Sequence, residues 1–393
     1  LPIGGPYKLT VSASGYDTET LSNIYLNLSQ TGDVSVSLRG STSADVVVAT
    51  ARANSEIFKI GTGTLLTRAD MDGIPTVNRS VADYAKLDPR VSINSASSRS
   101  TQISVMGANN RYNDFSIDGV SFNDPFGLNA NGFGTMRNPI SLDFISQISV
   151  DVTPFDVARG NTTGGSIATV TKSGSNDFHG SLYFSSRDDS NIGDDQNGVS
   201  YPTFEEETTT ATFSGPIIKD RLFFFVGYEE FEKSLPVLYG TKDSNAQNKA
   251  EVVTTAMADQ IKSIAMNTYG YDAGAINNVS FPETSEEYTI KLDAIINDSN
   301  RAVLNYSYNE SVLPRKYNGG ATVFSNNYYS KPPEIERVSF ELYSDLTDRL
   351  TSKLKFSSYE MEEDDSSLGD PYFPEVNISV TDGAGGEDNV YLG

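Results

Sequence analysis

The chain contains no cysteine, no tryptophan and a single histidine, His179, among its 393 residues. Without cysteine it can form no disulfide framework, thiolate nucleophile or thiolate metal site. One histidine leaves almost no material for a Ser-His-Asp triad or a multi-histidine metal site. The nearest approach to a phosphate-binding loop, residues 160–166, lacks the lysine that such a loop requires. We therefore expect a protein that is not an enzyme and that holds no cofactor.

Basic residues are also scarce, with 29 Lys and Arg against 52 Asp and Glu, which gives a net charge of -23. Nucleic-acid binding needs a basic surface, so this balance argues against it. Two acidic clusters, at 187–195 and 360–365, offer oxygen ligands of the kind that Ca²⁺ prefers. Their spacing is not that of an EF-hand loop, and solvated surface charge is the alternative interpretation.

No run of about 18 apolar residues occurs, so no transmembrane helix is predicted. Residues 176–364 instead read as seven strands whose connections alternate between very short and very long. Long loops at one end and tight turns at the other are typical of an outer-membrane barrel. The strands are expected near 179–187, 208–218, 221–232, 286–296, 301–310, 337–346 and 349–361, with tight turns at 219–220, 297–300 and 347–348.

Side-chain alternation agrees with this interpretation. In the fourth strand Tyr288, Ile290 and Leu292 share one face, while Thr289 and Lys291 share the other. A barrel would turn the apolar face to lipid and the charged face to its lumen. A soluble sheet with one wet face gives the same alternation, so the loop asymmetry decides between the two.

The N-terminal part divides into two short pieces. Residues 1–38 alternate like part of a small β-sandwich that is too short to fold alone. Residues 39–56 read as a flexible linker. The linker contains a β-branched run at 45–51 that could add as a strand to the sheet of another protein, or could be an ordinary strand of the next domain.

Residues 57–175 are predicted to form a compact α/β domain. Ser80 is expected to cap a short helix, with Asp83 completing a capping box. Strands are expected at 103–106, 114–117, 145–152 and 166–172. The long loop at 120–139 carries Phe122, Phe126 and Phe133 among Asn and Asp, so it either contacts a ligand or simply packs on itself. A helix at about 253–265, inside a later connection, could be a lid or a loop ornament.

Three stretches carry a family resemblance. SVMGANNRYNDFSIDGV at 104–120 resembles the plug domain of TonB-dependent outer-membrane receptors. PFDVARG at 154–160, TGGSI at 163–167 and TKSGSNDFHGS at 171–181 resemble the end of the plug and the entry into the barrel, and GPIIKDRLFFF at 215–225 is similar to the Oar-like branch. Residues 5–38 resemble the carboxypeptidase-regulatory-like sandwich of that branch.

The resemblance implies a mainly β protein with four parts: a truncated sandwich at 1–38, a linker at 39–56, an α/β plug at 57–175, and the first strands of a large transmembrane antiparallel barrel at 176–393. It implies residence in the bacterial outer membrane, contact with outer-membrane lipid, and energy from the TonB–ExbB–ExbD complex. We expect the chain to be a fragment of such a transporter. The TonB box would be Asp45, Val46, Val47, Val48 and Ala49.

The same resemblance places the substrate at plug loops that face outward. The candidate contacts are Asn109, Arg111, Asn113, Phe122, Asn123, Asp124 and Phe126. No substrate is indicated, and siderophore, oligosaccharide, peptide and protein all remain open. The rival hypothesis is a secreted or surface-anchored β-rich adhesin, which would be water-soluble.

Overall fold

The computed structural model describes residues 4–12, 18–26, 63–76, 79–97, 100–127, 129–135, 137–153, 163–193, 203–316, 322–347 and 350–393. The predicted linker, with its candidate TonB box at 45–49, lies outside the described residues. So do Asp194, Asp195 and Asp348, which belong to a predicted Ca²⁺ cluster and a predicted turn.

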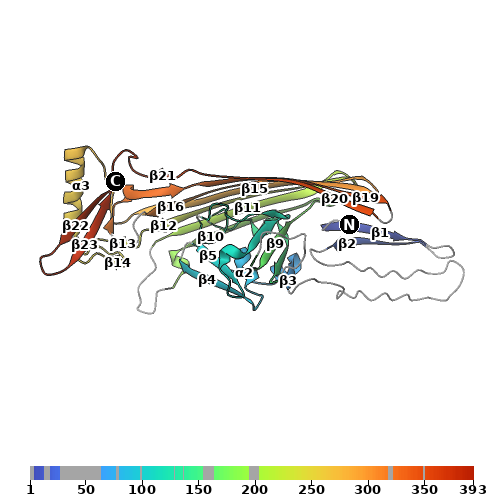
Figure 1. Cartoon of the computed structure of the whole chain (residues 1–393), viewed down its shortest axis with the longest axis horizontal. Coiled ribbons are helices and arrows are strands. Elements are labelled where there is room, and N and C mark those ends of the chain that lie inside the picture. Colours follow the sequence, from blue (N-terminus) through green and yellow to red (C-terminus); the bar gives the residue numbers. More distant parts are fainter. Residues whose placement is uncertain are drawn as a thin grey trace.

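Seven long strands form one large antiparallel sheet, which we call the large sheet (Figure 1). Each pairs with the next along the chain. All seven predicted strands are confirmed, and most extend further toward the long connections than predicted. In order they are β10 (His179–Asp188), β11 (Glu205–Ile218), β12 (Leu222–Pro236), β15 (Ser280–Asn297), β16 (Asn300–Lys316), β19 (Pro333–Thr347) and β20 (Leu350–Glu363).

The connections alternate in length as predicted. Register pairs close the short turns at Ile218↔Leu222, Asn297↔Asn300 and Thr347↔Leu350. Asp220 in the first of these turns adopts φ +63°, a left-handed conformation that Asp tolerates better than most side chains. The three long connections all leave the opposite end of the sheet, and the first of them begins with η3 (Asp189–Asn191).

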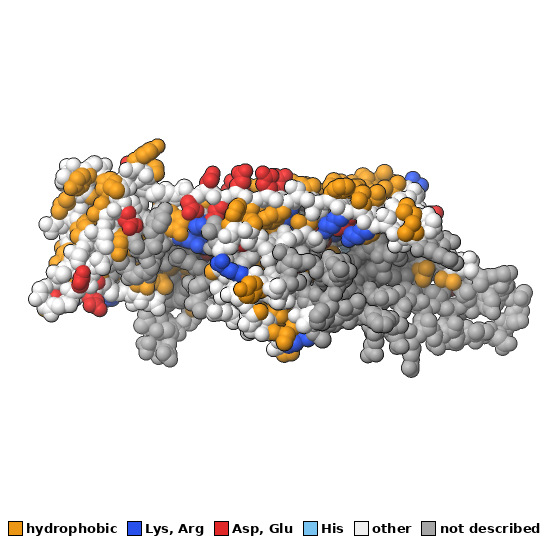
Figure 2. Space-filling model, viewed as in Figure 1, with side chains coloured by type: hydrophobic (Ala, Val, Ile, Leu, Met, Phe, Trp, Pro, Cys, Tyr) orange, Lys and Arg blue, Asp and Glu red, His pale blue; other side chains and the backbone are white. Residues whose placement is uncertain are grey.

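The outward face of the large sheet is layered along the strands. Nearest the short turns it is apolar, with Leu182 88% and Phe356 61% exposed. Next come Tyr228, Tyr288 and Tyr308, which are direct cross-strand neighbours. Beyond them runs a row of opposed glutamates: Glu230, Glu286, Glu310, Glu334 and Glu362. Figure 2 shows the apolar side chains gathered over the right-hand ends of β19 and β20 and acidic ones over the middle of the sheet. An apolar band bordered by aromatic residues is the surface that lipid requires.

A second, compact unit lies against the opposite face of the large sheet (Figure 1), and we call it the inner domain. Its five-stranded sheet has the order β3-β8-β9-β6-β7, and β4 and β5 form a separate hairpin. Its elements are β3 (Gly63–Thr67), α1 (Arg68–Asp72), α2 (Val81–Ala85), β4 (Val91–Ser97), β5 (Ser100–Val105), η1 (Asn110–Tyr112), β6 (Asp114–Ile117), β7 (Val120–Ser121), η2 (Leu142–Phe144), β8 (Ile145–Asp151) and β9 (Ser166–Thr171).

The predicted helix cap in the inner domain is confirmed, because Ser80 accepts a hydrogen bond from the Ala82 N–H and forms a capping box with Asp83. The inner domain has its own apolar core, which includes Phe122, Ile148 and Ile167. Only a few residues of the large sheet join that core. Phe225 is one of them, and its ring meets that of Phe144 edge-on at 6.2 Å.

The long connections pack on one another at the end of the large sheet. The helix predicted at 253–265 is confirmed as α3 (Thr255–Tyr269), and its Ala258 and Ala265 share a core with Phe324 and Val390 from two other segments. A helix that packs into a shared core is more than an ornament on one loop. The remaining elements here are β13 (Tyr239–Gly240), β14 (Asn248–Lys249), β17 (Thr322–Val323), η4 (Ser325–Asn327), β18 (Tyr328–Lys331), β21 (Ser366–Ser367), β22 (Val376–Thr381) and β23 (Glu387–Leu392).

At the N-terminal end, β1 (Gly4–Val11) and β2 (Glu19–Leu26) pair antiparallel. Their assignment to a regulatory-like sandwich stays a prediction. Within the described ranges, no helix has both the length and the apolar character needed to cross a membrane.

Candidate functional site

Two polar contacts are among those that hold the inner domain on the large sheet. The first, which we call the 137–141 anchor, joins the segment before η2 to two carboxylates on β12 and β15. Ser141 donates its hydroxyl to Glu229 Oε2 at 2.5 Å and its backbone N–H to Glu287 Oε2 at 2.8 Å. Both glutamates are buried, at 8% and 3% exposure. A buried carboxylate is stable only when it is hydrogen-bonded or paired with a cation. The two hydrogen bonds from Ser141 therefore stabilise Glu229 and Glu287 in their buried positions.

Arg137 adds a cation to the 137–141 anchor. Its Nη1 lies 3.3 Å from Glu229 Oε1, and its guanidinium covers the ring of Phe231 at 3.5 Å from the centroid. Thr210 of β11 donates to Glu229 Oε2 at 2.9 Å. Glu229 therefore has partners on both oxygens, whereas Glu287 Oε1 is buried without a hydrogen-bond partner.

The second contact, which we call the Asp118 anchor, has the opposite polarity, with a carboxylate on the inner domain and lysines on the large sheet. Asp118 accepts from Thr171 N at 3.0 Å and Thr171 Oγ1 at 2.6 Å, which ties β6 to the end of β9. Lys291 Nζ lies 3.5 Å from its Oδ1, Asn305 donates to its Oδ2, and Lys355 Nζ donates to its backbone oxygen at 2.9 Å. The carboxylate of Asp118 thus joins β6 to β9 and fixes the inner domain to β15 and β16, and its backbone oxygen adds a contact with β20.

The tight turn at Asp118-Gly119 makes the Asp118 anchor possible. Asp118 has φ +48° and Gly119 φ +70°, conformations that glycine adopts freely and aspartate tolerates. A side chain at Gly119 would also collide with Lys355, since an added Cβ would lie 2.7 Å from its Nζ. The strand that precedes this turn, 114–117, was predicted from the sequence, but the partners of Asp118 were not.

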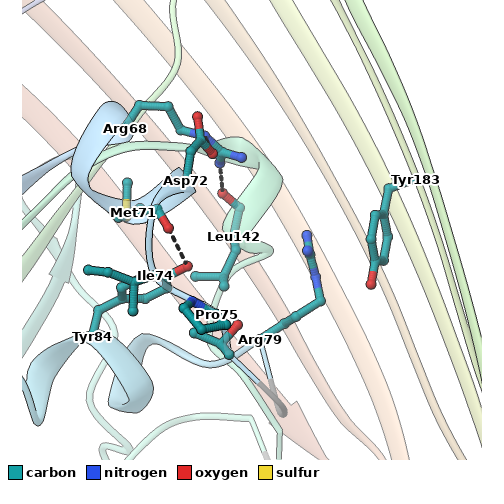
Figure 3. Close-up of a pocket in the computed structure, with 10 residues that line it drawn as sticks. Arg68, Met71, Asp72, Ile74, Pro75, Arg79, Tyr84, Leu142 and Tyr183 are labelled. Carbon is teal, nitrogen blue, oxygen red and sulfur yellow. Dashed lines mark hydrogen bonds and ion pairs between the residues drawn. The ribbon is translucent and has the colours of Figure 1, made fainter.

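A pocket of 230 Å³ opens between the inner domain and β10 (Figure 3). Arg79 points across it and stacks on Tyr183 of β10 at 3.8 Å from the ring centroid. Arg79 also pairs with Asp143 at 2.6 Å, and Arg68 pairs with Asp72 at 2.8 Å. The pocket is lined by Arg68, Met71, Asp72, Ile74, Pro75, Thr76, Arg79, Tyr84, Leu142 and Tyr183. Its charges are mostly paired, so it is a polar gap at the contact between the two units.

Two family descriptions match this architecture. "TonB-dependent Receptor Plug Domain" matches residues 60–166, which covers the inner domain, and "Outer membrane beta barrel domain" matches residues 170–242, where the large sheet begins. The chain therefore belongs to a TonB-dependent receptor with a plug and a barrel domain. From here on the inner domain is called the plug and the large sheet the barrel wall. The receptor resides in the bacterial outer membrane, and its family is not enzymatic.

Similarity to known proteins agrees with this assignment. The chain is 27% identical over 248 residues to the TonB-dependent transporter Oar of Myxococcus xanthus, a match that covers 57% of this chain and 22% of Oar. The solved structure of the outer membrane transporter YddB from Escherichia coli has the same fold, with a TM-score of 0.57 and 14% identity, over 84% of this chain and 42% of YddB. The chain thus spans less than half the length of these relatives.

The structure separates the predicted substrate contacts of the receptor into two groups. Asn109, Arg111 and Phe126 are exposed, Phe126 at 61%. An added Cβ at Gly127 would lie 3.1 Å from Arg111 Nη1, so Arg111 and the loop that carries Phe126 lie side by side. These three residues are free to meet a ligand in the conformation described.

The other four predicted contacts hold the plug together. Asn113 and Phe122 are buried, and Asn113 donates to Ile103 O at 2.7 Å. Asn123 accepts from Phe115 N at 2.7 Å, and Asp124 accepts from the backbone N–H of Phe126, Gly127 and Asn129. In this conformation their polar atoms serve the loop itself, so a substrate role for them stays a prediction.

Sequence analysis missed exposed apolar residues beside this loop. Tyr112, which follows Arg111 in the chain, is 59% exposed, and Met106, five residues before Arg111, is 67% exposed. Met106 directly follows β5 and has a left-handed φ of +52°. Neither this conformation nor the exposure of its side chain can be recognised from the sequence alone. Over the described ranges no group of three potential ligands could hold a metal ion, and Asp188 instead accepts from Ser190 N at 2.9 Å as the cap of η3.

Proposed function

We propose that the receptor is a transporter that carries an external substrate through the outer membrane with energy from TonB. The observation that supports this most is the way the plug is attached. It has an apolar core of its own, and its contact with the barrel wall includes two polar anchors, one through buried Glu229 and the other through buried Lys291. Polar contacts that water can replace can be broken and remade, whereas a continuous apolar interface could not.

The energised side of the proposed cycle begins at the TonB box, for which residues 45–49 are our candidate. A β-branched segment in a tether can add to a sheet edge of TonB, and the ExbB–ExbD complex would supply the force. The first described strand after the box is β3, an edge strand of the plug sheet that is held by five register pairs, Gly63↔Asp151 to Thr67↔Gln147. Force on the box would therefore load β3, an edge strand whose release from the plug sheet breaks its pairs with β8 alone.

The substrate side of the cycle lies at the long-connection end, which faces the cell exterior because barrels place their long loops there. We propose Asn109, Arg111 and Phe126, together with Met106 and Tyr112, as its first contacts on the plug. This surface combines two aromatic rings, a methionine and one cation. It suits a substrate with an apolar or aromatic part rather than a purely hydrophilic one.

The test uses the full-length protein in outer membranes and the isolated C-terminal domain of TonB as the probe. Val47→Pro should abolish its capture of that domain, because proline cannot donate to a strand pair, and Val47→Ile should leave capture intact. Equal capture by both variants would exclude 45–49 as the box. A protein that is recovered in soluble form, with no heat-dependent shift on a semi-native gel, would contradict the transporter and favour the adhesin.

A further inference from the structure

Arg337 of β19 is a largely buried cation for which the described residues offer no hydrogen bond or ion pair. Its side chain is 5% exposed. Its guanidinium lies over the ring of Phe122 on the plug, 4.6 Å from the centroid. An arginine carries five N–H donors, and an unpaired buried charge is costly. An arginine that is buried without an ion pair suggests that it pairs with an acidic residue in a second conformation of the protein.

Glu287 is the matching acceptor. Its Oε1 is buried and has no hydrogen-bond partner, while Oε2 accepts only from Ser141 of the plug. The nearby Arg137 pairs with Glu229 instead. Glu287 and Arg337 already act on each other electrostatically, although no hydrogen bond joins them. Glu287 therefore has an oxygen that can accept a hydrogen bond, and Arg337 has N–H groups that can donate one.

The strand registers place the two residues within reach of each other. Glu287 is opposite Asn309, and Asn309 is opposite Ile335, so Arg337 lies two strands away and two residues along on the same inner face. That is about 10 Å across the strands and about 7 Å along them. Both amide atoms of Asn309 are buried without partners between the two charges.

A small cavity borders Arg337. It is lined on the barrel wall by Asn305, Ser307, Arg337, Val338 and Ser339, and the plug closes it with Ile117 and Val120. Its volume of 10 Å³ is too small for a guanidinium, and it lies on the Asn305 side of Arg337, away from Glu287. The path of Arg337 toward Glu287 therefore requires the ring of Phe122 to move and does not use this cavity.

We propose that Arg337 exchanges partners: it rests on Phe122 while the plug is seated and pairs with Glu287 when the 137–141 anchor opens. Phe122, Arg137 and Ser141 all belong to the single connection between β7 and η2. A shift of that connection, which also carries the exposed Phe126, would remove the ring from Arg337 and the N–H from Glu287 together. Arg337 would then neutralise one of two adjacent carboxylates and so stabilise the opened state.

This inference rests on the proposed function, but its test needs neither TonB nor a substrate. Thr135, which is fully buried and lies two residues before Arg137, is replaced by cysteine in the full-length protein, and any cysteine outside residues 1–393 is replaced by serine so that one thiol reacts. The rate of its maleimide labelling in outer-membrane vesicles then reports opening of the 137–141 anchor. A transporter that failed to bind TonB would refute the proposed function and leave this measurement valid.

Arg337→Met should slow the labelling about tenfold, because the opened state loses its ion pair. Arg337→Lys keeps the charge and should slow it less. In a Glu287→Gln background Arg337→Met should change the rate less than about twofold, since no carboxylate is left to pair with. Heat-dependent gel migration of each variant checks that the barrel is intact.

Three results would overturn the exchange. Faster labelling of Arg337→Met would mean that the arginine merely clamps Phe122. An unchanged rate would mean that Arg337 does not act on the opening at all. A slowdown of the same size in the Glu287→Gln background would mean that Arg337 acts on the seated plug and not by pairing with Glu287.

Discussion

The two anchors of the plug differ in what else their charged groups hold. Asp118 accepts hydrogen bonds from Thr171 of the plug through both carboxylate oxygens and also pairs with Lys291 of the barrel wall. Breaking the Asp118 anchor would therefore open the plug sheet as well. Glu229 and Glu287 belong to the barrel wall and reach only a connection of the plug through Ser141 and Arg137.

This difference indicates which anchor yields first. The Asp118 anchor lies near the point where the chain passes from β9 into β10, and both of its carboxylate oxygens have hydrogen-bond partners, although Oδ1 of Asn305 is buried without one. The 137–141 anchor places two like charges beside each other and leaves one carboxylate oxygen, Glu287 Oε1, without a partner. We conclude that the Asp118 anchor is the fixed point of the plug and that the 137–141 anchor is the exchangeable one.

The largest effect is expected from Asp118→Ala. This change leaves the buried ammonium of Lys291 without its counter-charge, although Thr171 O and Oγ1 still accept from it, and leaves the amide of Asn305 without its acceptor. Loss of one partner of a buried pair costs about 3–5 kcal/mol. The free energy of plug unfolding, measured by pulse proteolysis across a urea series in outer membranes, should fall by that amount. Asp298→Ala, in an exposed turn, is the control and should stay within about 0.5 kcal/mol of the parent. Equal costs for the two variants would refute the role of Asp118.

Glu229→Ala should cost less, about 1–3 kcal/mol in the same measurement. It removes the acceptor of Ser141, Thr210 and Arg137, but it also relieves the repulsion between Glu229 and Glu287. The order of the two variants is therefore the informative result. If Glu229→Ala destabilised the plug more than Asp118→Ala, the assignment of the fixed and exchangeable anchors would be reversed.

Gly227→Ala tests the apolar support beside the 137–141 anchor. A Cβ at Gly227 would lie 2.4 Å from Cε1 of Phe144, in the short helix that follows Ser141. The ring must move, and such overpacking costs about 1–3 kcal/mol. Maleimide labelling at Thr135→Cys should accelerate accordingly. Gly193→Ala, which would meet nothing within 4 Å, is the matched control, and equal acceleration by both would show that the contact with Phe144 has no effect.

The smallest effect is a pH dependence inside the plug, away from both anchors. Hydrogen bonds from Arg90, with one from Thr64, lower the pKa of Asp88 from 3.8 to about 2. A lowered folded-state pKa means that the stabilisation is present above about pH 4 and is lost as the pH falls toward 2. Asp88→Asn should thus cost about 1–2 kcal/mol at pH 5 and almost nothing near pH 2, when urea midpoints are compared. A cost that does not change with pH would contradict this.

The strands of the barrel wall could be predicted because their signal is local. Alternation along each strand and the contrast between short and long connections need no knowledge of distant residues, and the same holds for the helix cap at Ser80. The layered outward face follows from the same pattern once the registers are known.

The anchors could not be predicted, since each joins residues far apart in the chain. Ser141 and Glu229 are 88 positions apart, and Asp118 and Asn305 are 187 apart. The sequence shows that inner faces are polar but not which polar residue meets the plug. The burial of Asn113 and Phe122 has the same cause, because a loop rich in Asn and Phe looks equally suited to packing and to binding.

Native-state hydrogen exchange on the full-length protein tests the difference between the anchors most directly. The N–H of Ser141 donates to Glu287 and the N–H of Thr171 donates to Asp118, so each anchor contains one backbone amide that is bonded to a carboxylate. Our account predicts that the Ser141 amide exchanges at least about tenfold faster than the Thr171 amide, through local opening of the 137–141 anchor. Equal protection of the two amides, or faster exchange at Thr171, would contradict it.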